Sequence, residues 1–391
     1  METRQRFADR IDWGLAFLLM LFFIVSALGI SSAQTSSVYG TNFVIRQAFW
    51  YVVGGIIIGG SLFFDPDQYK RLAWYVYGFG IFLLLALLVA PESIVPERNG
   101  AHSWFVLGPL GALQPSEFMK TFLILALARI ITNHHELNPK KTLQTDFQLL
   151  LKIGAATFVP LAFIMQQPDL GTSLVILAIM TGIILVSGIT WKLIVPIYAS
   201  ITVIGGIIFS LVIWAPELLE KYLKVQPYQF GRIYAWLDPY NYSKLEGFHL
   251  INSLNAIGSG QIFGKGYSDA EVYIPENHTD FIFSVIGEEY GFIGASVVIS
   301  LFFLLIYHLT KTALDTKEPF NAYVCAGIIS MITFHVFQNI GMTIQLLPIT
   351  GIPLPFISYG GSSLMGNMLA LGIVFSMRFY HKTYMFSSED S

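Results

Sequence analysis

Carboxylates within an apolar stretch are the first residues in this sequence that could carry out chemistry. The stretch "VYIPENHTDFIFSVIGEEYGFIGA" runs from Val272 to Ala295 and places Asp280 directly before an apolar run that contains Glu288 and Glu289. A carboxylate at such an edge can cap a helix, or it can act as a general base whose pKa is raised by apolar surroundings. On one continuous helix Glu288 and Glu289 would lie about 12–14 Å deeper than Asp280. We therefore expect all three to face protein or water rather than lipid.

A charged pair stands at the start of another apolar block. In "QPSEFMK", Glu117 and Lys120 are three residues apart, so they share one face of a helix and can pair. Pro115 suits the first helical turn, where the amide hydrogen that proline lacks would have no partner. The pair could be a structural link between helices, or it could form the charged wall of a cavity on the outer side.

Two further polar groups are candidates for support. Asp169 in "QQPDLGTS" follows Pro168 and precedes an apolar run, which is typical of a helix cap. His335, Gln338 and Asn339 share one helix face and are expected to form hydrogen bonds between helices. No spacing of histidine, cysteine and carboxylate matches a metal site, and no zinc-protease or nucleotide-loop motif is present.

The composition shows which elements must position these residues. Of 391 residues, 54% are hydrophobic and 12% charged, against about 25% charged in an average soluble domain. The apolar residues form long blocks that approach the ~20 residues of a membrane-spanning helix. The net charge of -3 gives no reason to expect a nucleic-acid partner. The single cysteine, Cys325, lies in an apolar block and cannot form an internal disulfide.

The hydropathy pattern predicts an all-α integral membrane protein, a polytopic bundle of about ten transmembrane helices. The first block is longer than the ~7–15 apolar residues of a signal peptide, so it is interpreted as the first span. No repeat or linker divides the chain, and residues 1–391 are expected to form a single integral membrane domain. The expected spans are 13–34, 44–64, 72–90, 115–133, 148–165, 171–189, 191–214, 281–307, 321–343 and 361–379.

Basic residues indicate the orientation. An even number of spans places both termini on one side, and that side holds most of the lysines and arginines. The positive-inside rule therefore predicts that both termini are cytoplasmic. The short opposite loops offer only Arg46 and Arg98. The basic residues of the predicted cytoplasmic side are Arg4, Arg6, Arg10, Lys70, Arg71, Lys140, Lys141, Lys192, Lys311, Lys317, Arg378 and Lys382.

Two outer segments are expected to shape the site. The long extracellular loop at about 215–280 mixes aromatic and apolar stretches and could hold an amphipathic segment at the outer leaflet. Near 344–363, Pro348, Pro353 and Pro355 interrupt any helix. Irregular backbone at membrane depth is tolerated where protein or water in a cavity forms hydrogen bonds with its N–H and C=O groups. A re-entrant segment that lines a cavity is therefore predicted.

Five longer motifs extend over essentially the whole chain. They are "RNGAHSWFVLGPLGALQPSEFMK", "DLGTSLVIL", "NAIGSGQIFGKG", "VYIPENHTDFIFSVIGEEYGFIGA" and "NIGMTIQLLPITGIPLPFISYGGSS". Together they resemble the SEDS family (shape, elongation, division and sporulation), and they are closer to its rod-shape branch, RodA, than to its division branch, FtsW. The most specific parts are "TDFIFSVIGEE" and "TGIPLPFISYGGSS".

The resemblance implies a ten-helix peptidoglycan glycosyltransferase in the bacterial cytoplasmic membrane. Members polymerise lipid II, an undecaprenyl-pyrophosphate-linked disaccharide pentapeptide, into glycan strands on the outer face. They work with a class B penicillin-binding protein, a transpeptidase that crosslinks the new glycan, and the rod-shape branch implies other membrane proteins of an elongation complex.

The resemblance also assigns roles to residues. The family's essential aspartate matches Asp280, expected to be the general base toward the 4-hydroxyl of the acceptor GlcNAc. Lys120 and Arg98 would hold the pyrophosphate or tune Asp280, with Glu117 keeping Lys120 in place. The remaining candidates for binding or support are Trp104 and the serines Ser358 and Ser362 of the family's "SYGGSS" loop, together with Asp169, His335 and Asn339.

Some alternatives stay open. A divalent cation, Mg or Mn, could bridge Asp280 and the pyrophosphate, and no other cofactor is implied. His249 and Asn252 stand where relatives often carry two glutamines, which puts a sugar-binding role there in doubt. Rival functions are a lipid II flippase, because carriers also use broken helices and buried charges, and a non-catalytic scaffold for a penicillin-binding protein.

Overall fold

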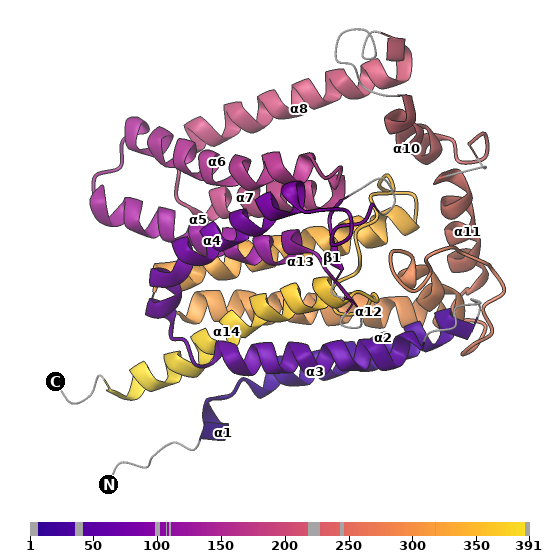
Figure 1. Ribbon diagram of the computed structural model, residues 1–391, viewed down its shortest axis with the longest axis horizontal. Helices are drawn as coiled ribbons and strands as arrows, with labels where there is room; N and C mark the ends of the chain where they lie inside the picture. Colours follow the sequence, from indigo (N-terminus) through magenta and orange to yellow (C-terminus); the bar gives the residue numbers. More distant parts are fainter. Residues whose placement is uncertain are drawn as a thin grey trace.

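The computed structural model describes residues 7–35, 42–97, 102–106, 108, 111–217, 227–242, 246–316 and 318–387. Within this part of the chain, ten long helices lie where the hydropathy pattern predicted them and run roughly alongside one another (Figure 1). This confirms the predicted all-α polytopic architecture. The long helices are α2 (Trp13–Thr35), α3 (Phe43–Ser61), α4 (Pro66–Val89), α5 (Pro115–Leu137), α6 (Leu143–Met165), α7 (Leu170–Val186), α8 (Trp191–Trp214), α12 (Ile282–Asp315), α13 (Pro319–Thr343) and α14 (Gly361–Ser387).

The two ends of the bundle differ. One end, here called the terminal end, carries both chain termini and the short helix α1 (Phe7–Arg10) (Figure 1). The opposite end, here called the loop end, carries α10 (Pro227–Leu237) and α11 (Glu246–Ser259) from the predicted extracellular loop. It also carries the antiparallel pair of β1 (Phe105–Val106) and β2 (Ala112–Leu113). The candidate site residues must therefore be sought near the loop end.

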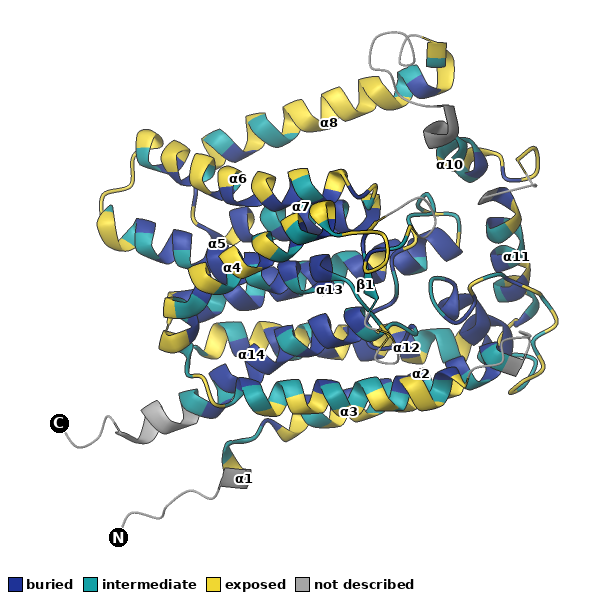
Figure 2. Cartoon of the chain, viewed as in Figure 1, coloured by how far each residue is buried: buried dark blue, intermediate teal, exposed yellow. Residues whose placement is uncertain are grey.

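Burial divides the helices into central and peripheral ones. Eight of the described helices are long and apolar enough to span a membrane; the other two long helices are α7, with 17 residues, and α5, which carries charged side chains. Within the spanning windows, 83% of the residues of α14 are buried, against 6% in α8. Figure 2 shows this contrast as dark blue in the middle of the bundle and yellow along α8. Helix α14 is therefore the most buried of these eight spans.

Helix α12 is broken near its start. The backbone leaves the helical region at Gly291 (φ 61°, ψ −157°), a conformation that glycine adopts without steric cost. The short part before this break holds Glu289 against Ser32, in the last turn of α2, and Glu288 against Lys265 of the loop. Both glutamates therefore face protein, as expected, and their partners are the end of α2 and the loop. The break follows them in the chain, so their depth of about 12–14 Å relative to Asp280 stays a prediction.

The segment between α13 and α14 is irregular from Ile344 to Gly360 and reaches deep into the bundle. The hydroxyl of Ser26, in the middle of α2, donates to the carbonyl of Ile357 at 2.8 Å. The ring centroids of Phe22 and Phe356 are 5.4 Å apart. These contacts confirm a re-entrant segment, whose backbone groups are satisfied by protein as the hydrocarbon depth requires.

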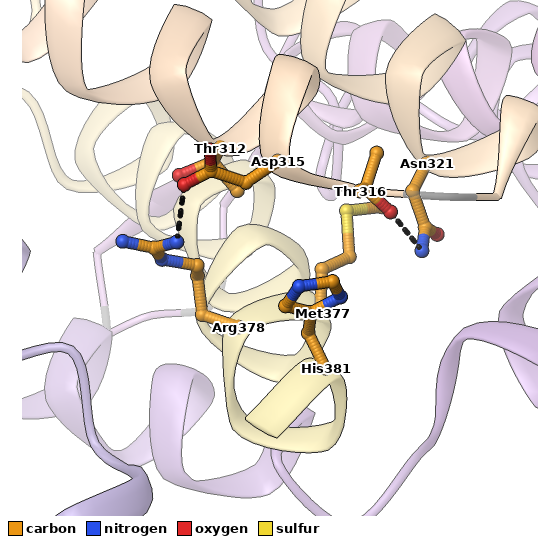
Figure 3. Close-up of a pocket in the computed structure, with 7 residues that line it drawn as sticks. All are labelled: Thr312, Asp315, Thr316, Asn321, Met377, Arg378 and His381. Atoms are coloured by element: carbon orange, nitrogen blue, oxygen red, sulfur yellow. Dashed lines mark hydrogen bonds and ion pairs between the residues drawn. The ribbon is translucent and has the colours of Figure 1, made fainter. Parts of the chain in front are cut away.

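A cluster of charges ties helices together at the terminal end. Asp12, just before α2, accepts hydrogen bonds from His308 of α12 at 2.7 Å and from Arg378 of α14 at 3.2 Å. Arg378 also pairs with Asp315 at 3.0 Å, and Figure 3 shows the two side chains turned toward each other. This terminal ion cluster (Asp12, His308, Asp315 and Arg378) connects α2, α12 and α14.

Candidate active site

Asp280 lies in the turn that leads into α12, at the loop end of the bundle. Its side chain is half-buried, and a Cβ added to Gly351 of the re-entrant segment would lie 3.3 Å from its carboxylate. Burial raises the pKa of Asp280 to about 6, and the negative charge of Glu276 adds to this, while the guanidinium of Arg232 acts in the opposite direction. A carboxylate with a pKa near 6 is ionised at neutral pH and is a stronger base than an ordinary aspartate.

Hydrogen bonds to the backbone hold the Asp280 turn. The amide of Asn339 donates to the carbonyls of Asp280 and Ile352, both at 2.8 Å, so it joins the turn to the re-entrant segment. The hydroxyl of Ser358 donates to the carbonyl of Thr279 at 2.6 Å. Asn339 and Ser358 were predicted to support the site, and in the structure they fix its backbone.

The predicted charged pair is sealed inside the bundle. Lys120 lies 2.9 Å from the carboxylate of Glu117 and 3.1 Å from Nε2 of His335, and its exposed fraction is 1%. Nδ1 of His335 lies 3.3 Å from the carbonyl of Pro353. A carbonyl only accepts, so Nδ1 carries the proton and Nε2 accepts from Lys120. Of the two readings, this geometry favours a structural link that joins α5, α13 and the re-entrant segment.

Asp169 and Ser362 organise the neighbouring hairpin. Asp169 caps α7 by accepting from the amide and hydroxyl of Thr172 at 2.9 and 2.7 Å, and it also accepts from the side chain of Gln114 at 2.9 Å. Ser362 accepts from the amide of Gln114 and donates to the carbonyl of Ala112, both at 3.0 Å. The capping interpretation of Asp169 therefore accounts for its position.

The 91–114 loop contains two further predicted site residues, a tryptophan and an arginine. Trp104 is half-buried directly before β1, on the same hairpin that Ser362 holds. Arg98 lies outside the described residues.

Sequence reasoning missed Arg232. It belongs to α10, which is docked onto the end of α13 by a reciprocal pair of bonds: Trp236 donates to the carbonyl of Gln345 at 2.9 Å, and the Gln345 amide donates back at 3.0 Å. This docking brings the charge of Arg232 to bear on Asp280. The available signal was a basic residue within the aromatic stretch "YQFGRIYAWLDPYNY".

The two residues that depart from the family pattern lie beside the site. The ring of His249 stacks on Phe281 with centroids 5.7 Å apart. Asn252 donates to the carbonyl of Tyr273 at 2.9 Å. Both contacts are internal to the loop end, so these residues pack and brace the segment around Asp280.

The carboxylates at and near Asp280 are the groups that could bind a divalent cation. Among the described residues, no group of three or more histidine, cysteine, aspartate or glutamate side chains comes together. Asp280 and the nearby Glu276 could supply two hard oxygen ligands, and Mg²⁺ commonly takes its remaining ligands from water and substrate phosphate. A divalent cation shared by Asp280 and a phosphorylated substrate stays a prediction.

These features define a polytopic α-helical membrane protein with an ionisable site at the end of its bundle opposite the termini. Residues 9–383 match the family model FtsW/RodA/SpoVE, described as "Cell cycle protein". The chain belongs to this family, which confirms the predicted SEDS membership.

Solved and curated relatives agree with this assignment. The probable peptidoglycan glycosyltransferase FtsW of Nitrosomonas europaea is 33% identical over 358 residues, covering 89% of this chain and 86% of that protein. The crystal structure of the rod shape determining protein RodA of Thermus thermophilus aligns with a TM-score of 0.66 and 28% identity, covering 94% and 96% of the two chains. A structure described as "Structural coordination of polymerization and crosslinking by a peptidoglycan synthase complex" contains a chain that aligns with a TM-score of 0.77 and 29% identity, covering 95% and 98%.

Proposed function

We propose that this protein is a peptidoglycan glycosyltransferase that polymerises lipid II into glycan strands, with Asp280 as the general base. The family membership and the names of its relatives support the activity. The single observation that carries the role of Asp280 is its half-buried carboxylate with a pKa raised to about 6, held at the loop end by Asn339 and the re-entrant segment.

The proposed reaction joins an acceptor hydroxyl to a donor sugar. The 4-hydroxyl of the acceptor attacks the anomeric carbon of the donor, and Asp280 takes the hydroxyl proton as the new bond forms. The bond to pyrophosphate breaks, and undecaprenyl diphosphate leaves with the electron pair. Positive charge near the departing phosphates lowers the barrier. Arg232 is the described cation nearest to this role, because its charge acts on Asp280, while Lys120 is buried in its pair with Glu117.

The setting of the reaction follows from the same proposal. The loop end faces the outer side and both termini are cytoplasmic, as the distribution of basic residues predicts. A class B penicillin-binding protein is the proposed partner, supported by the similarity to a chain of a complex that coordinates polymerization and crosslinking. A role in cell elongation is proposed from the motifs alone, since a relative named FtsW (33% identical) and a neighbour named as a rod shape determining protein (28% identical) do not separate the two branches.

A polymerisation assay on the purified protein tests the proposal. With fluorescent lipid II, the wild type should produce glycan strands, and Asp280→Asn should lower the rate by at least about 100-fold, the usual contribution of a general base. Asp269→Asn, an exposed carboxylate of the same loop, is the matched control and should keep full activity. An arm with chelator, followed by added Mg²⁺ or Mn²⁺, tests the proposed cation.

Other outcomes separate the rival functions. Full strand synthesis by Asp280→Asn would remove the proposed base. Movement of lipid II across vesicles without strand synthesis would support a flippase, and binding of a penicillin-binding protein with neither activity would support a scaffold.

A further inference from the structure

A groove in the lipid-facing surface lies outside the site described above. It has a volume of about 310 Å³ and is formed by α3, α4, α5 and α14, here called the α4–α5 groove. Apolar side chains dominate its wall, including Phe64, Leu72, Val76, Phe122, Leu125 and Ile373. Phe64 belongs to the α3–α4 connection, which lies at the terminal end (Figure 1). The groove therefore occupies the half of the bundle that holds the termini.

The polar residues of the groove present no free group to an occupant. The hydroxyl of Tyr69 donates to the carbonyl of Ser61 at 2.8 Å, and the Ser61 hydroxyl donates to Ile57 at 2.9 Å. The hydroxyl of Thr121 donates to the carbonyl of Gly366 at 3.4 Å. An occupant of the groove would therefore contact mainly apolar side chains. The volume of the groove is about ten times the ~30 Å³ that one water molecule takes in the liquid. This wall suits an alkyl chain.

An incompletely paired arginine stands beside the groove. Arg129 follows Leu125 by four residues on α5 and so lies on the same helix face, one turn closer to the terminal end. Its Nη1 donates to the carbonyl of Arg71 at 2.8 Å, next to the groove residue Leu72. Its Nε is buried and has no partner. No ion pair in the described part of the chain includes Arg129.

We propose that the α4–α5 groove binds a phospholipid with an anionic head group, with an acyl chain in the groove and the phosphate at Arg129. An arginine guanidinium binds a phosphate through paired donors, and Arg129 is only half-buried, so part of its side chain is accessible beside the groove. Arg71 is exposed nearby and adds positive charge. Basic pockets between transmembrane helices on the cytoplasmic side are suited to anionic lipid head groups. This site is separate from Asp280 and does not depend on the proposed activity.

The glycines of α3 allow a matched test. A Cβ added at Gly60, which lines the groove, or at Gly59, which does not, meets no atom within 4 Å. Gly60→Leu should therefore fill the groove without disturbing the backbone packing, and Gly59→Leu makes the same change outside it. Arg129→Gln removes the charge, and Arg129→Lys keeps it.

The measurement is the affinity of the purified full chain for phosphatidylglycerol, titrated by native mass spectrometry, with thermal unfolding as a check of folding. We expect Arg129→Gln to weaken binding by about fivefold, the effect of one basic side chain at an anionic surface. Gly60→Leu should also weaken binding, because its side chain occupies the space of the acyl chain. Gly59→Leu should bind like the wild type. Arg129→Lys should bind more weakly than the wild type but more tightly than Arg129→Gln, because lysine keeps the charge and lacks the paired donors. Inorganic phosphate at millimolar concentration should not displace the lipid, because it lacks the chain that fills the groove.

Several results would overturn the proposal. Equal affinity in all variants would mean that the lipid binds only as part of the general annulus. Equal affinity for phosphatidylcholine would remove the role of Arg129. A change of oligomeric state in Gly60→Leu, without a change in lipid binding, would assign the groove to a second copy of the chain.

Discussion

At the scale of single residues, the candidate site depends on how one carboxylate is surrounded. Asp280 has Glu276 and Arg232 as opposing charged neighbours, and burial sets the direction in which its pKa moves. The other predicted residues act mostly through hydrogen bonds to backbone: Asn339 and Ser358 hold the Asp280 turn. In the proposed site, the carboxylate of Asp280 is therefore the group that takes a proton, and the other residues named here position it.

The pH dependence of polymerisation tests this arrangement. Asp280 must be unprotonated to act as a base, so the rate should fall as the pH drops through about 6. Glu276→Gln removes a like charge, which lowers the pKa and moves the fall to lower pH. Arg232→Gln removes an opposite charge, which raises the pKa and moves the fall to higher pH. Shifts of both variants in the same direction would contradict this assignment.

At the scale of elements, local sequence patterns predicted the helices. Non-local contacts determined the features that the sequence did not predict. Runs of apolar residues predicted all ten spans, and Asp169 was recognised as a helix cap. The break at Gly291 could not be predicted, because a glycine within an apolar run is compatible with a helix. It exists because the loop packs there: the amide of Lys265 donates to the carbonyl of Glu288, and that of Phe292 to Gln261. The influence of Arg232 on Asp280 likewise depends on a non-local contact, the hydrogen bond between Trp236 and Gln345, which are 109 residues apart in sequence.

The broken start of α12 leads to a prediction about the loop. Glu288 accepts from Lys265 at 2.7 Å and from the amides of Glu271 and Val272 at 2.9 and 3.2 Å. Glu288→Gln removes the charge, so hydrogen exchange of these two amides should accelerate by about tenfold. Asp269→Asn, an exposed carboxylate of the same loop, should leave the exchange of these two amides unchanged. Equal exchange in Glu288→Gln and wild type would show that the loop is held by other contacts.

At the scale of the whole molecule, polar contacts join helices at both ends of the bundle. The Asp280 turn and the re-entrant segment join helices at the loop end, and the terminal ion cluster joins α2, α12 and α14 at the other. Burial raises the pKa of Asp12, but His308, the amide of Leu15 and Arg378 outweigh it, so the pKa lies well below its usual range.

This direction gives a prediction for stability against pH. A depressed pKa means that Asp12 stabilises the folded state above its unfolded pKa of about 3.9 and loses this effect as the pH falls further. Asp12→Asn should therefore destabilise the protein by about 1–3 kcal/mol at pH 7. The difference from wild type should shrink below about pH 4, as measured by thermal unfolding in detergent. Asp67→Asn, an exposed carboxylate at the same end, is the control. A difference between Asp12→Asn and wild type that stayed constant from pH 7 down to pH 3 would contradict the prediction.

The burial of α14 has a consequence for how the protein is made. The ribosome synthesises this helix after the other nine long helices described here, yet 83% of its spanning window is buried in the folded molecule. The re-entrant segment just before it carries backbone groups that lipid cannot satisfy, so it cannot settle until its neighbours have assembled. A nascent chain released before α14 is made would therefore expose the surfaces of α3 and α5 that this helix covers in the folded protein.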